Sequence, residues 1–165
     1  MPVAIAIVMA TAACAPPEPA KSGTAGSADA REFQGSWNAS GRRYIIPLGA
    51  GRNGSIIHLR GSMLLAGEGR PGVGFRADVV ALVDTATGLV GRSVWTDENG
   101  DQVFGELKGE GTASRNRITG TIFGGTGRYA SVTGTYEFSW EYVIESDDGS
   151  IQGRAVGLKG RVALK

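Results

Sequence analysis

The chain has 165 residues, 41% of them hydrophobic, and its 17 basic residues nearly balance its 16 acidic ones. This length fits one domain with a short extension. The balanced charge and the lack of a basic run argue against a nucleic-acid-binding protein. Glycine is abundant (27 residues) but follows no Gly-X-Y period, which excludes a collagen-like chain.

Residues 1–14 are apolar or small and end in Ala10-Thr11-Ala12-Ala13-Cys14, a pattern that resembles a bacterial lipoprotein signal peptide with its lipobox. Cleavage there would make Cys14 the site of lipid attachment. Cys14 is the only cysteine, so it cannot form an internal disulfide. We therefore expect an exported protein of the bacterial cell envelope, held at the membrane by an N-terminal lipid. The alternatives are an ordinary cleaved secretion signal, giving a secreted protein, and a cytoplasmic protein.

Residues 15–30 are rich in proline, alanine, glycine and serine, which predicts a flexible linker. The folded domain is expected to cover residues 31–165. Alternation of apolar and polar residues along it predicts strands, with no room for a helix of useful length. The expected strands are Phe33 to Ile46, Ser55 to Ala66, Val73 to Asp84, Leu89 to Thr96, Gln102 to Gly109, Arg117 to Phe123, Val132 to Ile144 and Ser150 to Leu164.

Eight strands joined by short turns predict an all-β fold, an eight-stranded antiparallel up-and-down β-barrel. Turn chemistry separates the strands, as at Gly49 to Gly54 and at Asn99-Gly100. The interior of such a barrel is either filled by side chains or holds one small ligand. Both options stay open because large and small residues alternate on the apolar faces.

The strand from Val132 carries the densest set of aromatic residues. Every second position is apolar, and these residues are expected on the buried face: Val132, Gly134, Tyr136, Phe138, Trp140, Tyr142 and Ile144. Across all strands, the candidates for lining a ligand pocket in the lumen are Phe75, Trp95, Leu107, Tyr136, Phe138, Trp140 and Tyr142. An aromatic stripe of this kind can equally be ordinary core.

Two hairpin motifs between about residues 90 and 140 carry a resemblance. Gly124-Gly125-Thr126-Gly127-Arg128-Tyr129, followed by Val132 to Tyr136, resembles the glycine-turn hairpin of the allene oxide cyclase and dirigent barrel superfamily. Trp95-Thr96-Asp97 with Gly100 to Phe104 resembles the preceding hairpin of small exported bacterial members. The resemblance implies a barrel. The cyclases' glutamate, polar water-holding groups and aromatics have no counterpart in Trp37 to Ile46, so catalysis is not carried over.

A shorter motif, Phe33-Gln34-Gly35-Ser36-Trp37, resembles the Gly-x-Trp start of lipocalins. Lipocalins are also eight-stranded barrels that bind ligands. A tryptophan that plugs one end of the barrel would explain the motif equally well.

Residues that could support chemistry are few. Asp97, Asn99 and Asp101 resemble the start of a calcium loop, but lysine stands where the bidentate glutamate belongs, so we expect a hairpin turn. His58 is the only histidine, and its neighbours predict an exposed position. Glu137 and Glu141 are too far apart for a paired-carboxylate site and are expected outside. We expect no metal and no cofactor.

The sequence therefore favours a non-catalytic barrel that binds a small apolar ligand or an envelope partner. The first alternative is a cofactor-free isomerase or cyclase of the allene oxide cyclase type, which an acid such as Glu106 or Glu110 in an open lumen would favour. The second is a structural envelope protein with a filled barrel. The ligand and the oligomeric state are not readable from the sequence.

Overall fold

The computed structural model describes residues 30–67, 69, 71–110 and 116–164. The expected signal peptide with Cys14, and the expected linker except for its last residue, lie outside the described residues. The strands are β1 (Arg31–Gly49), β2 (Arg52–Ala66), β3 (Val73–Asp84), β4 (Gly88–Thr96), β5 (Gln102–Gly109), β6 (Asn116–Gly125), β7 (Thr133–Glu145) and β8 (Ser150–Ala163), with one short 3-10 turn, η1 (Gly127–Tyr129).

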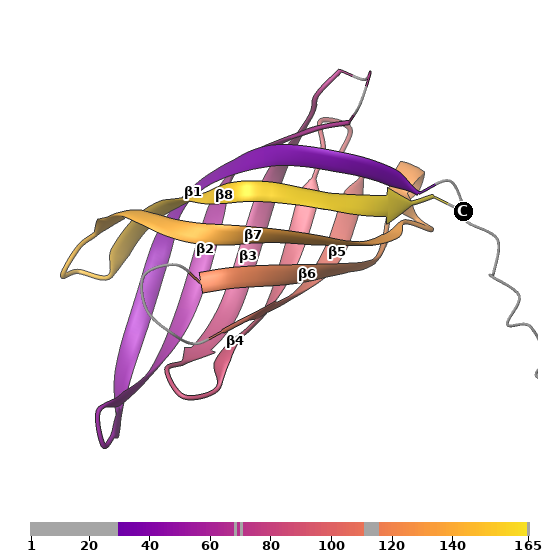
Figure 1. Cartoon of the computed structure of the whole chain (residues 1–165). Helices are drawn as coiled ribbons and strands as arrows, with labels where there is room; N and C mark the ends of the chain where they lie inside the picture. Colours follow the sequence, from indigo (N-terminus) through magenta and orange to yellow (C-terminus); the bar gives the residue numbers. More distant parts are fainter. Residues whose placement is uncertain (1–29, 68, 70, 111–115, 165) are drawn as a thin grey trace, which may run out of the picture.

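The eight strands form a closed barrel in sequence order (Figure 1). Each strand pairs antiparallel with the next, and β8 pairs antiparallel with β1 to complete the ring. The predicted all-β, up-and-down barrel is therefore confirmed. No helix in the described part of the chain is long and apolar enough to cross a membrane.

Strand boundaries agree best where turn residues flank a regular alternation. β3 and β5 begin and end at the predicted residues. The first turn was predicted too long: β1 continues to Gly49 and β2 already begins at Arg52. Three consecutive residues with positive φ (Gly49, Ala50 and Gly51) make this tight turn. The polar residues that follow it, Arg52 and Asn53, therefore belong to β2.

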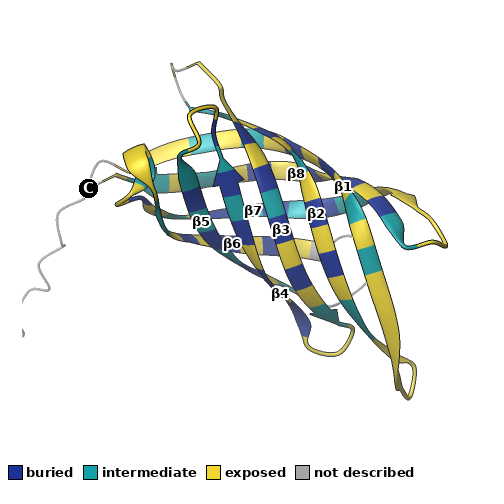
Figure 2. Cartoon of the chain, turned by 180° about the vertical axis from the view of Figure 1, so that it is seen from behind, coloured by how far each residue is buried: buried dark blue, intermediate teal, exposed yellow. Residues whose placement is uncertain are grey.

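Buried and exposed residues alternate along the strands (Figure 2). On β3, for example, Phe75, Ala77, Val79 and Ala81 are buried while Arg76 is exposed. The prediction for Ile144 was wrong, because its side chain is 46% exposed. A register shift between Tyr142 and Ile144 interrupts the ladder to β8, and an irregularity of this kind ends the two-residue alternation.

The outer face of the barrel carries ion pairs between neighbouring strands. Glu137 accepts from Arg117 and lies 3.2 Å from the Lys159 amine, while Glu141 lies 3.2 Å from Arg154. Both glutamates therefore occupy the predicted outer positions. The exposed His58 has its Nε2 3.9 Å from the Asp78 carboxylate. Exposed pairs of this type add little to stability, because water screens the charges and the long side chains lose freedom on pairing.

Asp97 organises the β4–β5 turn. One of its carboxylate oxygens accepts from the backbone N–H groups of Asn99 (2.8 Å) and Asp101 (3.0 Å). The other accepts from the Nε of Arg128 in η1 (2.8 Å). Burial acts to raise the pKa of Asp97, but these hydrogen bonds outweigh it and hold the pKa below its usual value. The three residues of the calcium-like motif thus form the predicted hairpin turn.

Candidate functional site

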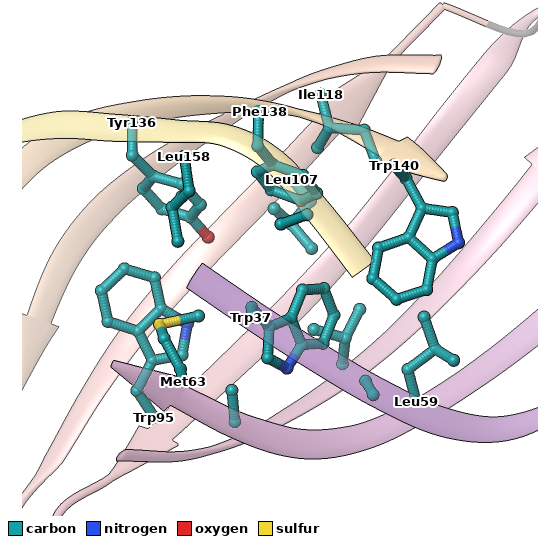
Figure 3. Close-up of a cluster of buried hydrophobic side chains, with 14 of the residues drawn as sticks. Trp37, Leu59, Met63, Trp95, Leu107, Ile118, Tyr136, Phe138, Trp140 and Leu158 are labelled. Carbon is teal, nitrogen blue, oxygen red and sulfur yellow. The ribbon is translucent and has the colours of Figure 1, made fainter. Parts of the chain in front are cut away.

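The lumen contains a continuous series of aromatic side chains, and Figure 3 shows its central members, Trp95, Tyr136, Phe138, Trp37 and Trp140. Successive ring centroids lie 4.9–6.2 Å apart, within the range of favourable aromatic contacts. In spatial order the rings belong to Tyr129, Phe75, Trp95, Tyr136, Phe138, Trp37, Trp140 and Tyr142.

Tyr136 fills the middle of this series because two glycines leave space for its ring. A Cβ on Gly120, its partner on β6, would lie 2.0 Å from the Tyr136 Cζ atom. The Tyr136 hydroxyl lies 3.2 Å from the buried Ser93 hydroxyl, and a Cβ on Gly105 would also touch both hydroxyls. Tyr136 lines neither of the two pockets in the lumen, which lie on either side of it.

One pocket, the terminal pocket, lies at the end of the barrel where β1 begins and β8 ends. Its volume is about 680 Å³. Phe75, Trp95 and Tyr129 form its aromatic wall, but Ala30 and Leu164, at the two ends of the described chain, also contribute to the lining.

The second pocket, the hairpin pocket, lies at the opposite end, towards the β1–β2 and β7–β8 turns. Its volume is about 410 Å³. Aliphatic residues of β2 to β6 line one side and aromatic residues of β1 and β7 line the other. Both volumes fall within the roughly 300–1,000 Å³ that is typical of small-molecule sites. Its lining includes Trp37, Arg43, Val83, Trp140, Tyr142 and Glu145.

The charged residues that line the hairpin pocket form one ion pair at its rim. The Nη2 atom of Arg43 lies 2.6 Å from the Glu145 carboxylate, and the Arg43 guanidinium carbon lies 5.4 Å from the centre of the Tyr142 ring. Burial raises the pKa of Tyr142, so this phenol is uncharged near neutral pH. The rim is therefore electrically neutral overall.

Three buried nitrogen atoms among the described residues have no hydrogen-bond partner: Trp37 Nε1, Trp140 Nε1 and Arg43 Nε. All three residues line the hairpin pocket. Leaving a buried donor unsatisfied costs roughly 1–3 kcal/mol, so native structures contain few of them. The three nitrogens belong to residues of the same pocket, and each is enclosed by neighbouring protein atoms.

The predicted lumen residues all come from the inner face of the barrel, but they divide between the two ends. Phe75 and Trp95 line the terminal pocket. Leu107, Phe138, Trp140 and Tyr142 line the hairpin pocket. Of the two acids considered for catalysis, Glu106 faces outward with Arg92 3.2 Å away, and Glu110 is exposed at the end of β5. Within the described ranges, no cluster of three or more metal-binding side chains is present.

Sequence reasoning missed three inward-facing residues. Trp37 was considered only as a plug, although it lies between Phe138 and Trp140. Arg43 shares its face of β1 with Trp37 and Ala39, so the two-residue period could have placed it inside. Ser93 could have been found in the same way, because it stands two residues before Trp95.

Fold and site together define a closed eight-stranded barrel with an apolar pocket at each end. Comparison with known protein families, with curated proteins and with solved structures found no match to this chain. The likeness to the allene oxide cyclase and dirigent superfamily therefore rests on the two hairpin motifs alone and stays a prediction.

We expect the free energy of unfolding to fall between about pH 10 and pH 12 because of Tyr136. Burial raises the pKa of Tyr136 to about 12, and the hydrogen bond to Ser93 lowers it only in part. The unfolded chain releases this proton near its ordinary value of 10.0, so the folded state binds the proton more tightly. The stabilisation is complete below about pH 10 and is lost as the pH rises towards 12, a change of about 3 kcal/mol.

Urea unfolding of the wild type and of Tyr136→Phe over this alkaline range measures the effect. The difference between the two proteins isolates Tyr136 from the other tyrosines, lysines and arginines. A difference that does not change with pH would contradict the raised pKa.

Proposed function

We propose that this protein is a non-catalytic barrel that binds a small, largely apolar molecule in the hairpin pocket. The observation that carries the proposal is an apolar, aromatic-walled pocket of about 410 Å³ whose charged lining is a single neutralised pair. Sites for small molecules typically combine such walls with a few polar groups that orient the ligand. The pocket also argues against a completely filled barrel.

The polar lining supports binding better than catalysis. A general acid or base works best with a pKa near the operating pH and with access to the substrate. Here Arg43 and Glu145 are engaged with each other, and Glu106 faces outward. The terminal pocket is the weaker candidate because the ends of the described chain contribute to its walls.

The proposal includes export and attachment to the cell envelope through a lipid on Cys14. Its basis is the signal-like segment 1–14 and the linker-like composition of residues 15–30. Retention of the chain in the membrane fraction of its host, and its release in Cys14→Ser, is the corresponding test.

Native mass spectrometry of the full chain, purified from its own host, tests ligand binding. We expect an additional mass that disappears after organic extraction. Val83 and Val73 provide a matched pair of variants, because they lie near opposite ends of β3 and line the hairpin pocket and the terminal pocket respectively. Val83→Trp should abolish the additional mass, whereas Val73→Trp should retain it.

Three other outcomes would change the proposal. Loss of the mass in Val73→Trp alone would move the site to the terminal pocket. A clean apo mass, with no uptake from a library of lipids and polyketide-like molecules, would exclude ligand binding and favour a structural role. Chemical conversion of an added molecule by the purified chain would favour the cofactor-free isomerase.

A further inference from the structure

The β1–β2 hairpin projects beyond the closed part of the barrel and carries apolar side chains on both of its faces. Pairing of β1 with β8 ends at Arg42, whereas its pairing with β2 continues to Gly49. The end of β1 is exposed throughout, so the alternation of buried and exposed positions stops there (Figure 2). Tyr44 and Ile46 are 62% and 61% exposed on the outer face, and Ile45 is 52% exposed on the inner face.

The exposed apolar surface continues from this hairpin across the outer side of the barrel. Tyr44 pairs with Ile56, and Ile56 pairs with Leu82. Leu82 pairs in turn with Val90, so one apolar row crosses four adjacent strands, and each of its side chains is more than half exposed. Soluble proteins rarely expose contiguous apolar patches larger than a few hundred Å², and larger ones mark contact with a protein or a membrane. The outer flank is the surface formed by Tyr44, Ile46, Leu48, Ile56, Leu82 and Val90.

We propose that the outer flank and the tip of the β1–β2 hairpin dock onto the surface of a lipid bilayer. The hairpin tip enters the region between the headgroups and the acyl chains, and Tyr44 lies at the level of the headgroups, where tyrosine is favoured. Ser55 and Val83 line both the hairpin pocket and a groove of about 450 Å³ on the outer flank. The mouth of the hairpin pocket therefore lies beside the docked surface.

The charges beside the outer flank are paired, which favours an uncharged lipid surface. Asp84 is the only charged residue in the lining of the groove, and its carboxylate lies 2.7 Å from Nη2 of Arg52. In the neighbouring row of outward residues, Arg92 lies 3.2 Å from the Glu106 carboxylate. Docking therefore does not require anionic headgroups, and burial of apolar area drives it.

A bilayer fits this surface better than a second copy of the chain does. A rigid partner seated on the outer face of β1 to β4 would leave Ile45, on the other face of the hairpin, in water. Lipid surrounds the tip and covers both faces. The β7–β8 hairpin, whose turn contains the exposed Asp147 and Asp148, points in a different direction from the β1–β2 hairpin (Figure 1), so these acids remain in water.

The tether proposed above allows this orientation, and this step alone rests on the proposed function. A segment as long as residues 15–30 spans about 55 Å when fully extended. It ends at Ala30, at the end of the barrel away from the hairpin tip. β1 has 19 residues and a length of about 65 Å, and the tilt of strands makes a barrel shorter than its strands. A lipid on Cys14 and the hairpin tip can therefore reach the same bilayer, and two contacts hold a protein more firmly than one.

Quenching by brominated lipid tests the docking. The full chain, purified from its own host, is reconstituted with phosphatidylcholine vesicles whose acyl chains carry bromine, which quenches tryptophan on contact. The emission added by Ile46→Trp should be mostly lost and should shift to shorter wavelength. Leu64→Trp is the matched control, because Leu64 is 54% exposed on the outer face but lies towards the opposite end of β2. Its added emission should remain, after subtraction of the wild-type signal in both cases.

A second pair of variants connects the quenching to the outer flank. Ile56 and Leu64 lie on the same face of β2 and are both 54% exposed. Ile56→Glu, added to Ile46→Trp, should restore most of the emission, because a carboxylate opposes burial in lipid. Leu64→Glu, added to Ile46→Trp, should leave the quenching unchanged.

The outcomes separate this inference from the proposed function. Vesicle-bound protein in which Ile46→Trp is not quenched would overturn the docking and leave the ligand pocket and the lipid on Cys14 intact. Quenching only in the presence of anionic phosphatidylglycerol would overturn the apolar contact. Sedimentation as a dimer without lipid, abolished by Ile56→Glu, would assign the outer flank to a second copy instead. A clean apo mass together with quenched Ile46→Trp would overturn the ligand-binding function alone.

Discussion

Replacing Gly120 by valine is expected to lower the free energy of unfolding by about 3 kcal/mol, the upper end of the usual range for overpacking a core. A Cβ at this position would lie 2.0 Å from Cζ of Tyr136 and 2.2 Å from Cε1, far inside van der Waals contact. The Tyr136 ring is 4% exposed and packs against Trp95, so it cannot move aside without disturbing the centre of the lumen. Urea unfolding of the purified variant measures the loss.

Two further proteins identify the cause of this loss. Gly74→Val is the matched control, because a Cβ on Gly74 in β3 would meet nothing within 4 Å. It should leave stability nearly unchanged. The double variant Gly120→Val/Tyr136→Ala should lose less stability than the sum of the losses in the two single variants. This is the non-additivity expected for residues in contact. Equal losses at Gly74 and Gly120 would show that a general property of glycine in strands is responsible instead.

Trp37→Ala is expected to destabilise the barrel by about 3–5 kcal/mol, as other large-to-small changes of buried aromatic residues do. The Trp37 ring lies 5.0 Å from the Trp140 ring and 6.0 Å from the Phe138 ring, so its removal opens a cavity in the aromatic series. The free energy of unfolding in urea and the thermal midpoint should both fall.

Trp37→Phe should cost much less than Trp37→Ala. It keeps a ring in the series and removes a buried indole N–H that has no hydrogen-bond partner, so the loss of packing is partly offset. If the two variants were equally destabilised, the indole N–H would have an important partner in the folded protein, contrary to the site described here.

The barrel was predictable from the sequence because its strands are regular and its turns are chemically distinct. In β3 the residues from Phe75 to Ala81 alternate without interruption, and glycine and proline precede the strand. Register irregularities between strands could not be predicted from the sequence. The apolar period of β7 runs on through Ile144, but the register shift beyond Tyr142 leaves that side chain exposed.

The presence of aromatic residues in the lumen was also predictable, but their division into two pockets was not. That division depends on how the Tyr136 ring lies across Gly120 and reaches Ser93, which is a matter of side-chain packing between strands. Sequence periodicity assigns a face to each residue, whereas the space between faces depends on contacts between residues far apart in the chain. Arg43 was assigned to neither face, although it is in phase with the buried Trp37 and Ala39 on β1.

The entropic cost of closing the chain differs between the β1–β8 seam and the other strand pairings of the barrel. Seven of the strand pairings join neighbours in the sequence, whereas this seam joins residues as distant as Arg31 and Val162. Closing a loop of about a hundred residues directly would cost roughly 3 kcal/mol more than closing a short turn. Once the seven consecutive hairpins exist, their shared twist has already brought the two outer strands together, so the cost largely disappears. Ring closure is therefore cheapest as the last event in folding, and until it occurs both β1 and β8 present open edges to other chains.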